Sequence, residues 1–230
     1  MNTVTPFSAS DSIPPLRDGD GLSLDEFERR WEAMPDLKFA ELIEGIVYLG
    51  GPVRLREHGS PNVEIAAWLV NYKIDTPGVI PGLHCSLRLD ARNELQPDVL
   101  MMIDPALGGQ VRLDEAGIAE GAPELVIEVA ATGACRDATI KSRIYERFGV
   151  REYVLWRVRD REIDWSILRD GRYEALKPDA DGTLRSEVFP GLWLNPDAML
   201  TADLAGVLAT LQRGLATPEH AAFAARLGGA

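Results

Sequence analysis

The feature that most constrains this chain is an apolar run with a carboxylate in its middle. Residues 124–130 read Glu-Leu-Val-Ile-Glu-Val-Ala, which is typical of a strand buried on both faces. A helical pattern follows, because Ile140, Ile144 and Phe148 recur at intervals of four and Gly149 suits the helix end. A buried strand that leads into a helix predicts an α/β domain.

Short strands and helices are predicted along the rest of the chain. Start signals place helices after Ser23, with Glu26 completing a capping box, and at Ser60-Pro61. Turn dipeptides at Glu44-Gly45 and Asp170-Gly171 predict two hairpins. Apolar patterns predict strands at 83–89, 97–103, 153–158, 161–168 and 184–194, and a helix through Leu204, Val207, Leu208 and Leu211. The expected fold class is α/β (α+β), with a central mixed sheet flanked by helices.

The predicted organisation has three parts. Residues 1–20 are polar and contain prolines, so we expect a disordered leader. Residues 21–200 are expected to form one domain, and residues 201–230 a C-terminal helical tail. No internal repeat divides the chain.

Composition excludes several classes of protein. Two cysteines, Cys85 and Cys135, exclude a disulfide scaffold and a four-cysteine zinc site, and no apolar run is long enough for a membrane span. With no secretory signal visible, we expect a cytoplasmic protein. The net charge of −12 argues against a non-specific DNA binder, but residues 136–172 hold ten Lys and Arg against seven Asp and Glu.

Glu128 is the carboxylate inside the buried run. In such a strand it must be paired, protonated or bound to a cation, because an unpaired buried charge is very costly. The alternative is an edge strand on which Glu128 faces water.

Asp98 opens the strand predicted at 97–103, within Gln96-Pro97-Asp98. Pro-Asp is common in turns, so a purely structural role is the alternative. If the two strands pair, Asp98 and Glu128 converge on one hard cation such as Mg²⁺, which prefers oxygen ligands. Such an ion polarises a phosphate and activates a bound water. Without the ion, we expect at least one of the two carboxyl groups to titrate high.

Lys141 lies one turn into the helix that follows the Glu128 strand, and Tyr145 shares its helix face. From there a lysine reaches back toward the strand end, positions an attacking water and stabilises charge on phosphorus. The alternative is a lysine whose stem packs beside the core while its charge stays in water.

Together these residues resemble the Uma-two family of restriction endonucleases, within the PD-(D/E)xK nuclease superfamily. The matching pieces run in the family's order from about Leu22 to Leu194. They are Phe39 with Glu41-Leu42-Ile43-Glu44-Gly45, His58, Gln96-Pro97-Asp98, residues 123–129, Asp137 with Lys141 and Tyr145, residues 149–153 and residues 186–192.

The resemblance implies a restriction-endonuclease-like core in which Asp98 and Glu128 bind Mg²⁺ or Mn²⁺ and Lys141 completes the catalytic set. The superfamily usually places its lysine two positions after the acid, where this chain has Ala130. The family places it on the following helix, where Lys141 fits. Residues 131–133, Ala-Thr-Gly, depart from the family's usual Ser-Pro-Ser/Thr segment.

Two further matches have open roles. Glu41 is a candidate for an additional acid near the metal. His58 either touches the site or makes a hydrogen bond at the entry to its helix.

These inferences predict a metal-dependent DNA endonuclease, a phosphodiester hydrolase. We expect a homodimer, because cleaving both strands of a duplex needs two sites. The alternative is a catalytically silent nuclease-fold protein that acts as a nucleic-acid-binding or protein-interaction module, which the net charge and the altered residues 131–133 favour. In a third interpretation the acids are merely solvated.

Overall fold

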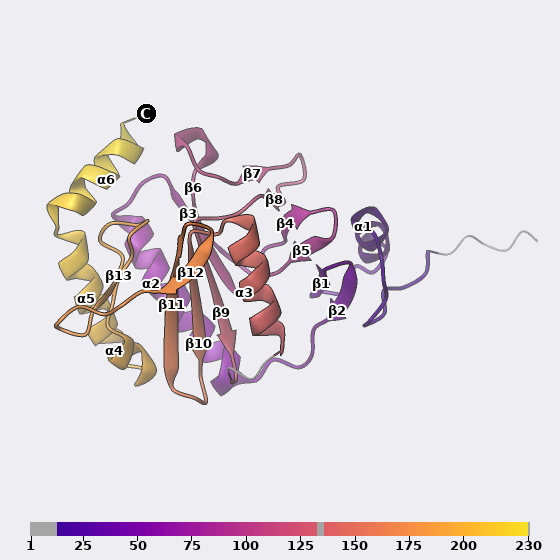
Figure 1. Cartoon of the computed structure of the whole chain (residues 1–230), viewed down its shortest axis with the longest axis horizontal. Helices are drawn as coiled ribbons and strands as arrows, with labels where there is room; N and C mark the ends of the chain where they lie inside the picture. The colour runs from indigo at the N-terminus through magenta and orange to yellow at the C-terminus, as the bar shows by residue number, and fades with distance from the viewer. Residues whose placement is uncertain (1–12, 133–135, 230) are drawn as a thin grey trace, which may run out of the picture. The chain divides into compact units, whose positions relative to one another are not determined.

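A computed structural model of the protein describes residues 13–132 and 136–229, with the side chains of residues 136–138 left undescribed. The expected α/β class is confirmed, since mixed sheets are flanked by helices (Figure 1). The chain forms two units, Met1–Gly50 with Asp90–Leu95, and Gly51–Leu89 with Gln96–Ala230.

The first unit combines one helix with a small antiparallel sheet. Its elements are α1 (Leu24–Glu32), β1 (Ala40–Ile43), β2 (Ile46–Leu49) and β5 (Asn93–Leu95), with β1 between β2 and β5. The predicted hairpin is confirmed, because Glu44 and Gly45 both have positive φ in the tight turn between β1 and β2. Leu16 is buried in the core of this unit with Phe27, so residues within the expected leader already pack there.

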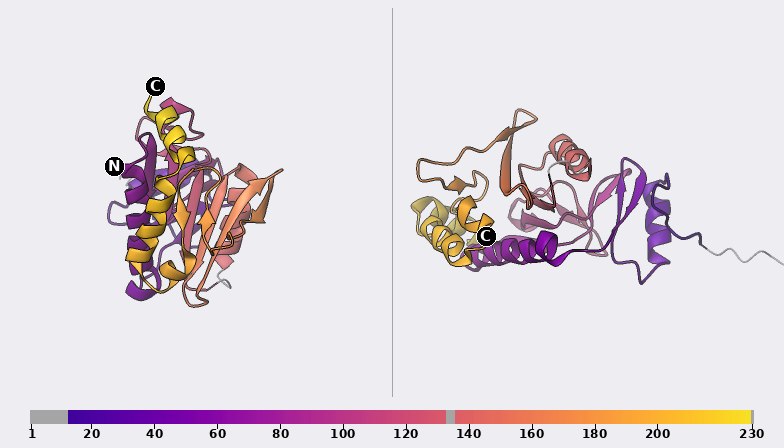
Figure 2. Two further views of the ribbon diagram at one scale, coloured as in Figure 1. Left: turned by 90° about the vertical axis from the view of Figure 1, so that its left-hand side faces the viewer. Right: turned by 90° about the horizontal axis from the view of Figure 1, so that it is seen from below.

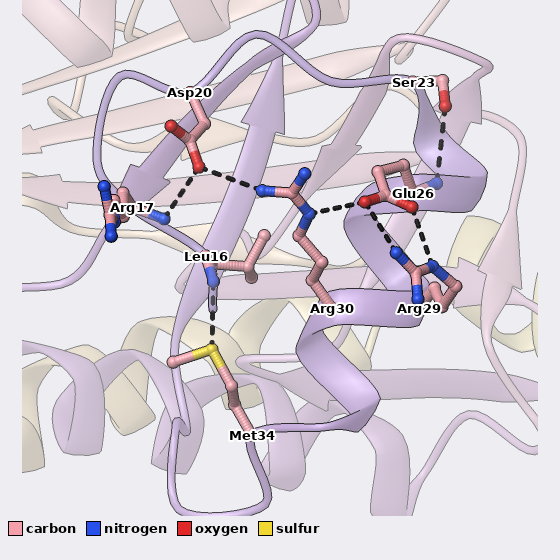
Figure 3. A network of polar contacts seen from close by, with 8 residues as sticks. All are labelled: Leu16, Arg17, Asp20, Ser23, Glu26, Arg29, Arg30 and Met34. Atoms are coloured by element: carbon pink, nitrogen blue, oxygen red, sulfur yellow. Dashed lines mark hydrogen bonds and ion pairs between the residues drawn. The ribbon is translucent and has the colours of Figure 1, made fainter. Parts of the chain in front are cut away.

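The start of α1 differs from the capping box that the sequence suggests. Ser23 Oγ accepts a hydrogen bond from the Glu26 N–H, as expected. The Glu26 carboxylate instead binds the side chains of Arg29 and Arg30, at 2.8 and 2.6 Å (Figure 3). Two arginines one turn away compete for this carboxylate, which therefore leaves the cap to Ser23 alone.

The second unit is built on a six-stranded mixed sheet. Its order is β12-β11-β10-β9-β6-β3, and β9 and β10 are parallel neighbours while the other pairs are antiparallel. The strands are β3 (Val79–Leu83), β6 (Val99–Ile103), β9 (Leu125–Ala130), β10 (Glu152–Arg157), β11 (Glu162–Arg169) and β12 (Arg172–Ala175). The predicted buried strand is thus confirmed as β9.

Helices cover both faces of this sheet (Figures 1 and 2). On one face lie α2 (Ser60–Ile74), α4 (Pro196–Leu200), α5 (Leu204–Leu215) and α6 (Pro218–Gly228), and on the other lies α3 (Arg136–Phe148). Leu125, Ile127 and Val129 of β9 join the core beneath α2, together with Trp68. Because side chains alternate along a strand, Glu128 points to the α3 face.

Short elements complete the second unit. They are η1 (Leu55–Gly59, a π-helix), η2 (Pro105–Leu107), β4 (Leu87–Asp90), β7 (Arg112–Leu113), β8 (Ala119–Glu120), β13 (Leu184–Arg185) and β14 (Trp193–Leu194). β4 pairs with β8, which pairs with β7. Within the described residues, no helix is both long and apolar enough to cross a membrane.

Two predicted strands were wrong in extent. The strand expected at 83–89 is divided between the end of β3 and the start of β4. The strand expected at 184–194 is a two-residue pair, β13 and β14, separated by a turn. Gly191 has a φ of 87° in that turn, and a Cβ there would lie 2.8 Å from His220 Cβ, so the backbone must reverse at a glycine.

Candidate functional site

The candidate site lies where β9 ends and β6 begins. In the antiparallel register Val99 faces Ile127, so Asp98, one residue earlier, lies beside Glu128. Both carboxylates are buried, and so is Lys141, with 6 to 7% of each residue exposed. The alternative in which these groups are merely solvated is therefore wrong.

Asp98 is held by groups from three parts of the second unit. Its Oδ2 accepts a hydrogen bond from the Val129 N–H at 2.7 Å, which ties β6 to β9. Its Oδ1 lies 2.8 Å from His58 Nε2, in η1, and 3.4 Å from Asn62 Nδ2, in the first turn of α2. His84, in the segment between β3 and β4, lies farther from Oδ1, at 3.8 Å.

Charge and hydrogen bonding decide the protonation of Asp98 and His58. Burial acts to raise the pKa of Asp98, but the hydrogen bond and charge of His58, the Val129 N–H and the charge of Lys141 outweigh it, so the pKa is lowered. The Asp98 hydrogen bond raises the pKa of His58 against the opposing effect of burial. The raised pKa that we expected for at least one of the two carboxyl groups is therefore not found at Asp98.

Glu128 is held from α3. Lys141 Nζ and the Tyr145 hydroxyl both donate to its Oε1, at 3.2 and 2.8 Å. The three residues lie together because the first turns of α3 return over the end of β9. An ammonium and a phenol on one carboxylate oxygen leave the charged form of Glu128 supported inside a buried site.

Three tyrosine rings contact one another in a row that begins at Tyr145, the partner of Glu128; Tyr153 is tilted against Tyr145 and stacked on Tyr173. The ring centroid of Tyr153 on β10 lies 5.6 Å from that of Tyr145 and 5.8 Å from that of Tyr173. The Tyr153 hydroxyl is buried and makes no hydrogen bond to the described residues. Burial, with the charge of Glu128 adding to it, raises the pKa of Tyr153 and keeps it neutral.

The donor set fits one class of cation. Two carboxylates on neighbouring strands suit a hard divalent ion that retains several waters, as Mg²⁺ does. Within the described part of the chain, no group of three or more His, Cys, Asp and Glu side chains is placed to hold a metal ion. A site closed by protein ligands, as structural zinc requires, is therefore not built here.

The remaining predicted residues have different outcomes. Glu41 is buried on β1 of the first unit, opposite Tyr48 of β2. The Asp137 side chain and Gly133 lie outside the described residues, so the match at Asp137 and part of the altered segment stay predictions. His58 is at the site, through Asp98, rather than only at a helix entry.

Asn62 and His84 were missed from sequence. The signal for Asn62 was its position four residues after His58, which places both on one helix face, and the Nδ2 of Asn62 lies 3.1 Å from His58 Nδ1. No local signal marks His84, because its contact depends on how the segment after β3 folds against β6.

Glu152 connects two of the segments that match the family in sequence. Its buried carboxylate joins the matching segments 149–153 and 186–192. Oε1 accepts from the backbone N–H groups of Glu187 and Val188, and Oε2 accepts from Ser186 Oγ and Trp165 Nε1. Through Glu152 these two segments therefore hold β10 to the turn between β13 and β14.

Comparison with known proteins assigns the family. The model of the Uma2 family, Uma-two above, described as "Putative restriction endonuclease", matches residues 24–197. The chain belongs to this family. The resemblance drawn from the sequence is thereby confirmed, and the Uma2 assignment supports a nuclease function.

A solved structure is similar in fold. It is described as "a putative nuclease belonging to DUF820 from Anabaena variabilis", and it matches with a TM-score of 0.59 and 17% sequence identity. The match covers 78% of this chain and 98% of that one. At this identity the similarity concerns the fold, which agrees with the mixed α/β core of this Uma2 protein. No curated protein matches this chain.

Proposed function

We propose that this Uma2 protein is a divalent-metal-dependent endonuclease that hydrolyses phosphodiester bonds in DNA. The observation that carries the proposal is the pairing of two buried carboxylates, Asp98 and Glu128, on adjacent strands, with Lys141 bonded to Glu128 at 3.2 Å. Buried charges persist where they are paired, and clusters of this kind occur preferentially at functional sites.

In this proposal Asp98 and Glu128 hold Mg²⁺ or Mn²⁺, which when bound supplies polarisation of the phosphate and an activated water. Lys141 Nζ stabilises the negative charge that develops on the phosphate oxygens. Tyr145 orients Glu128 through its hydroxyl, and His58 orients Asp98 from the other face of the sheet. Each ligand thus has a fixed geometry before substrate arrives, which is what precise catalysis requires.

The quaternary and cellular parts of the proposal follow from this chemistry. Cutting both strands of a duplex takes two sites, and a twofold homodimer supplies them. Cys85 is a free thiol, which suits a cytoplasmic enzyme. Sedimentation at micromolar concentration tests the dimer, and a monomer unchanged by Mg²⁺ would contradict it.

One observation favours the alternative, a catalytically silent nuclease-fold protein. Glu128 Oε1 already bonds Lys141 and Tyr145, and the described residues hold no cluster of three metal-binding side chains. Plasmid nicking in Mg²⁺ and in Mn²⁺ separates the two. We expect nicking by wild type and by Asp36→Ala, an exposed control, and none by Asp98→Ala. Absence of nicking by folded wild type in both metals would favour the silent protein.

A further inference from the structure

Two segments meet beside the candidate site, at the end of the sheet where β9 and β10 finish and α2 starts (Figure 1). One is the turn after β10, whose Val158 and Arg159 N–H groups donate to Ala130 O and Ala131 O at 2.9 and 3.0 Å. The other is η1, from which His58 reaches Asp98. Glu57 links the two segments, because Arg159 Nη2 binds its Oε1 at 2.6 Å.

These segments concentrate positive charge. We call residues 54–58 and 159–161 the arginine rim; it contains four arginines and two acids, Glu57 and Asp160. Glu57 binds Arg159 and also Arg54, at 3.3 Å, and these contacts lower its pKa and keep it ionised. Arg54 and Arg159 are therefore neutralised within the rim by their contacts with Glu57.

The other two arginines face solvent. Arg56 and Arg161 are exposed, and neither side chain forms an ion pair or a hydrogen bond with the described residues. A guanidinium has a planar fork of donors that matches phosphate oxygens, and it is more weakly hydrated than an ammonium. Two such groups, unneutralised and beside a phosphodiesterase site, form a surface suited to a polyanion.

We propose that the arginine rim binds the phosphate backbone of duplex DNA next to the scissile bond, with Arg56 and Arg161 making the contacts. This inference rests on the proposed function and deepens it. The net charge of −12 does not prevent such binding, because charges farther away than a Debye length, about 10 Å at 0.1 M salt, are largely screened. At contact distance the local excess of arginine dominates.

The experiment measures DNA binding apart from cleavage. A fluorescein-labelled 30-base-pair duplex is titrated with full-length protein in EDTA, by anisotropy, at several salt concentrations. Arg56→Ala/Arg161→Ala is compared with Arg112→Ala/Lys177→Ala, which removes two exposed positive charges outside the rim. Each phosphate contact contributes about 0.9 to the slope of log affinity against log salt, or about eightfold in affinity at 0.1 M. We therefore expect the rim variant to bind between about eightfold and sixtyfold more weakly, with a slope lower by about one to two.

Each outcome decides something. The inference is supported if the rim variant loses affinity and slope while the control variant matches wild type and both keep the wild-type melting temperature. It is overturned if the two variants weaken equally or if wild type does not bind the duplex. Rim-dependent binding with no nicking in metal would instead refute the proposed function and leave this inference standing. Normal nicking by wild type, with DNA binding that does not depend on the rim arginines, would refute this inference and leave the proposed function standing.

Discussion

Replacing Glu152 with glutamine tests how a buried carboxyl group controls stability across neutral pH. Burial raises the pKa of Glu152 to about 7, although four donors oppose that shift. An acid with a raised pKa in the folded state stabilises the fold fully below its ordinary pKa of 4.5, and this contribution is lost as pH rises toward 7. The shift corresponds to about 3 kcal/mol lost between pH 4.5 and 8.

Glutamine keeps the volume and removes the titration. Its carbonyl oxygen can accept from Glu187 and Val188, but its NH₂ group then faces Trp165 Nε1, which is also a donor. Leaving that indole N–H without an acceptor costs about 1–3 kcal/mol. We therefore expect Glu152→Gln to be less stable than wild type at pH 5 and to equal or exceed it at pH 8.

Urea unfolding at half-unit intervals from pH 5 to 8 measures both effects. Glu115→Gln, at an exposed position, is the control and should follow wild type throughout. Because part of the loss falls below pH 5, the difference between wild type and Glu152→Gln should change by about 2.5 kcal/mol over this range. A difference that stays constant with pH would refute the reasoning, since it would mean that the four donors hold the carboxylate ionised.

Three further predictions concern the site. Mg²⁺ should raise the melting temperature of wild type, because it binds only the folded arrangement, and Glu128→Gln should abolish that rise in differential scanning fluorimetry while Glu115→Gln keeps it. Lys141→Ala should retain the Mg²⁺-dependent rise but lose plasmid nicking; unchanged nicking would remove Lys141 from the catalytic set. In metal-free protein, His58→Ala should lower the free energy of unfolding by about 1–3 kcal/mol, because the buried Asp98 carboxylate loses a hydrogen bond to a cationic donor. No loss by urea unfolding would show that the pair adds nothing to stability.

The sheet could be predicted where apolar runs are continuous and could not where special residues interrupt them. β9 was evident because four large apolar side chains allow no solvated face. β3 was missed because Pro81 and Gly82 normally end a strand. It is the edge strand of its sheet, where a proline without an N–H is tolerated and a glycine costs little.

Some residues of the candidate site could likewise be predicted from the sequence, and others could not. Asp98, Glu128 and Lys141 could be proposed because their chemistry conflicts with their apolar surroundings, and that conflict is visible in a single stretch of sequence. Asn62 and His84 are polar residues whose neighbours in sequence give no sign that they are unusual. Their positions beside Asp98 depend on how α2 and the segment after β3 pack against β6, which no local pattern specifies.

The two carboxylates are supported from opposite faces of one sheet, and this arrangement follows from where they lie. Lys141 and Tyr145 reach Glu128 from α3, whereas His58 and Asn62 reach Asp98 from η1 and the first turn of α2. In the middle of the sheet the strands separate these two layers, so side chains from both can converge only at a strand end. At that end Val129 connects the core to the site, because its side chain packs in the core under α2 while its N–H donates to Asp98. A change that shifts β9 against β6 by one residue would therefore turn Glu128 to the opposite face of the sheet while Asp98 keeps its own, and it would dismantle the site without removing any of its residues.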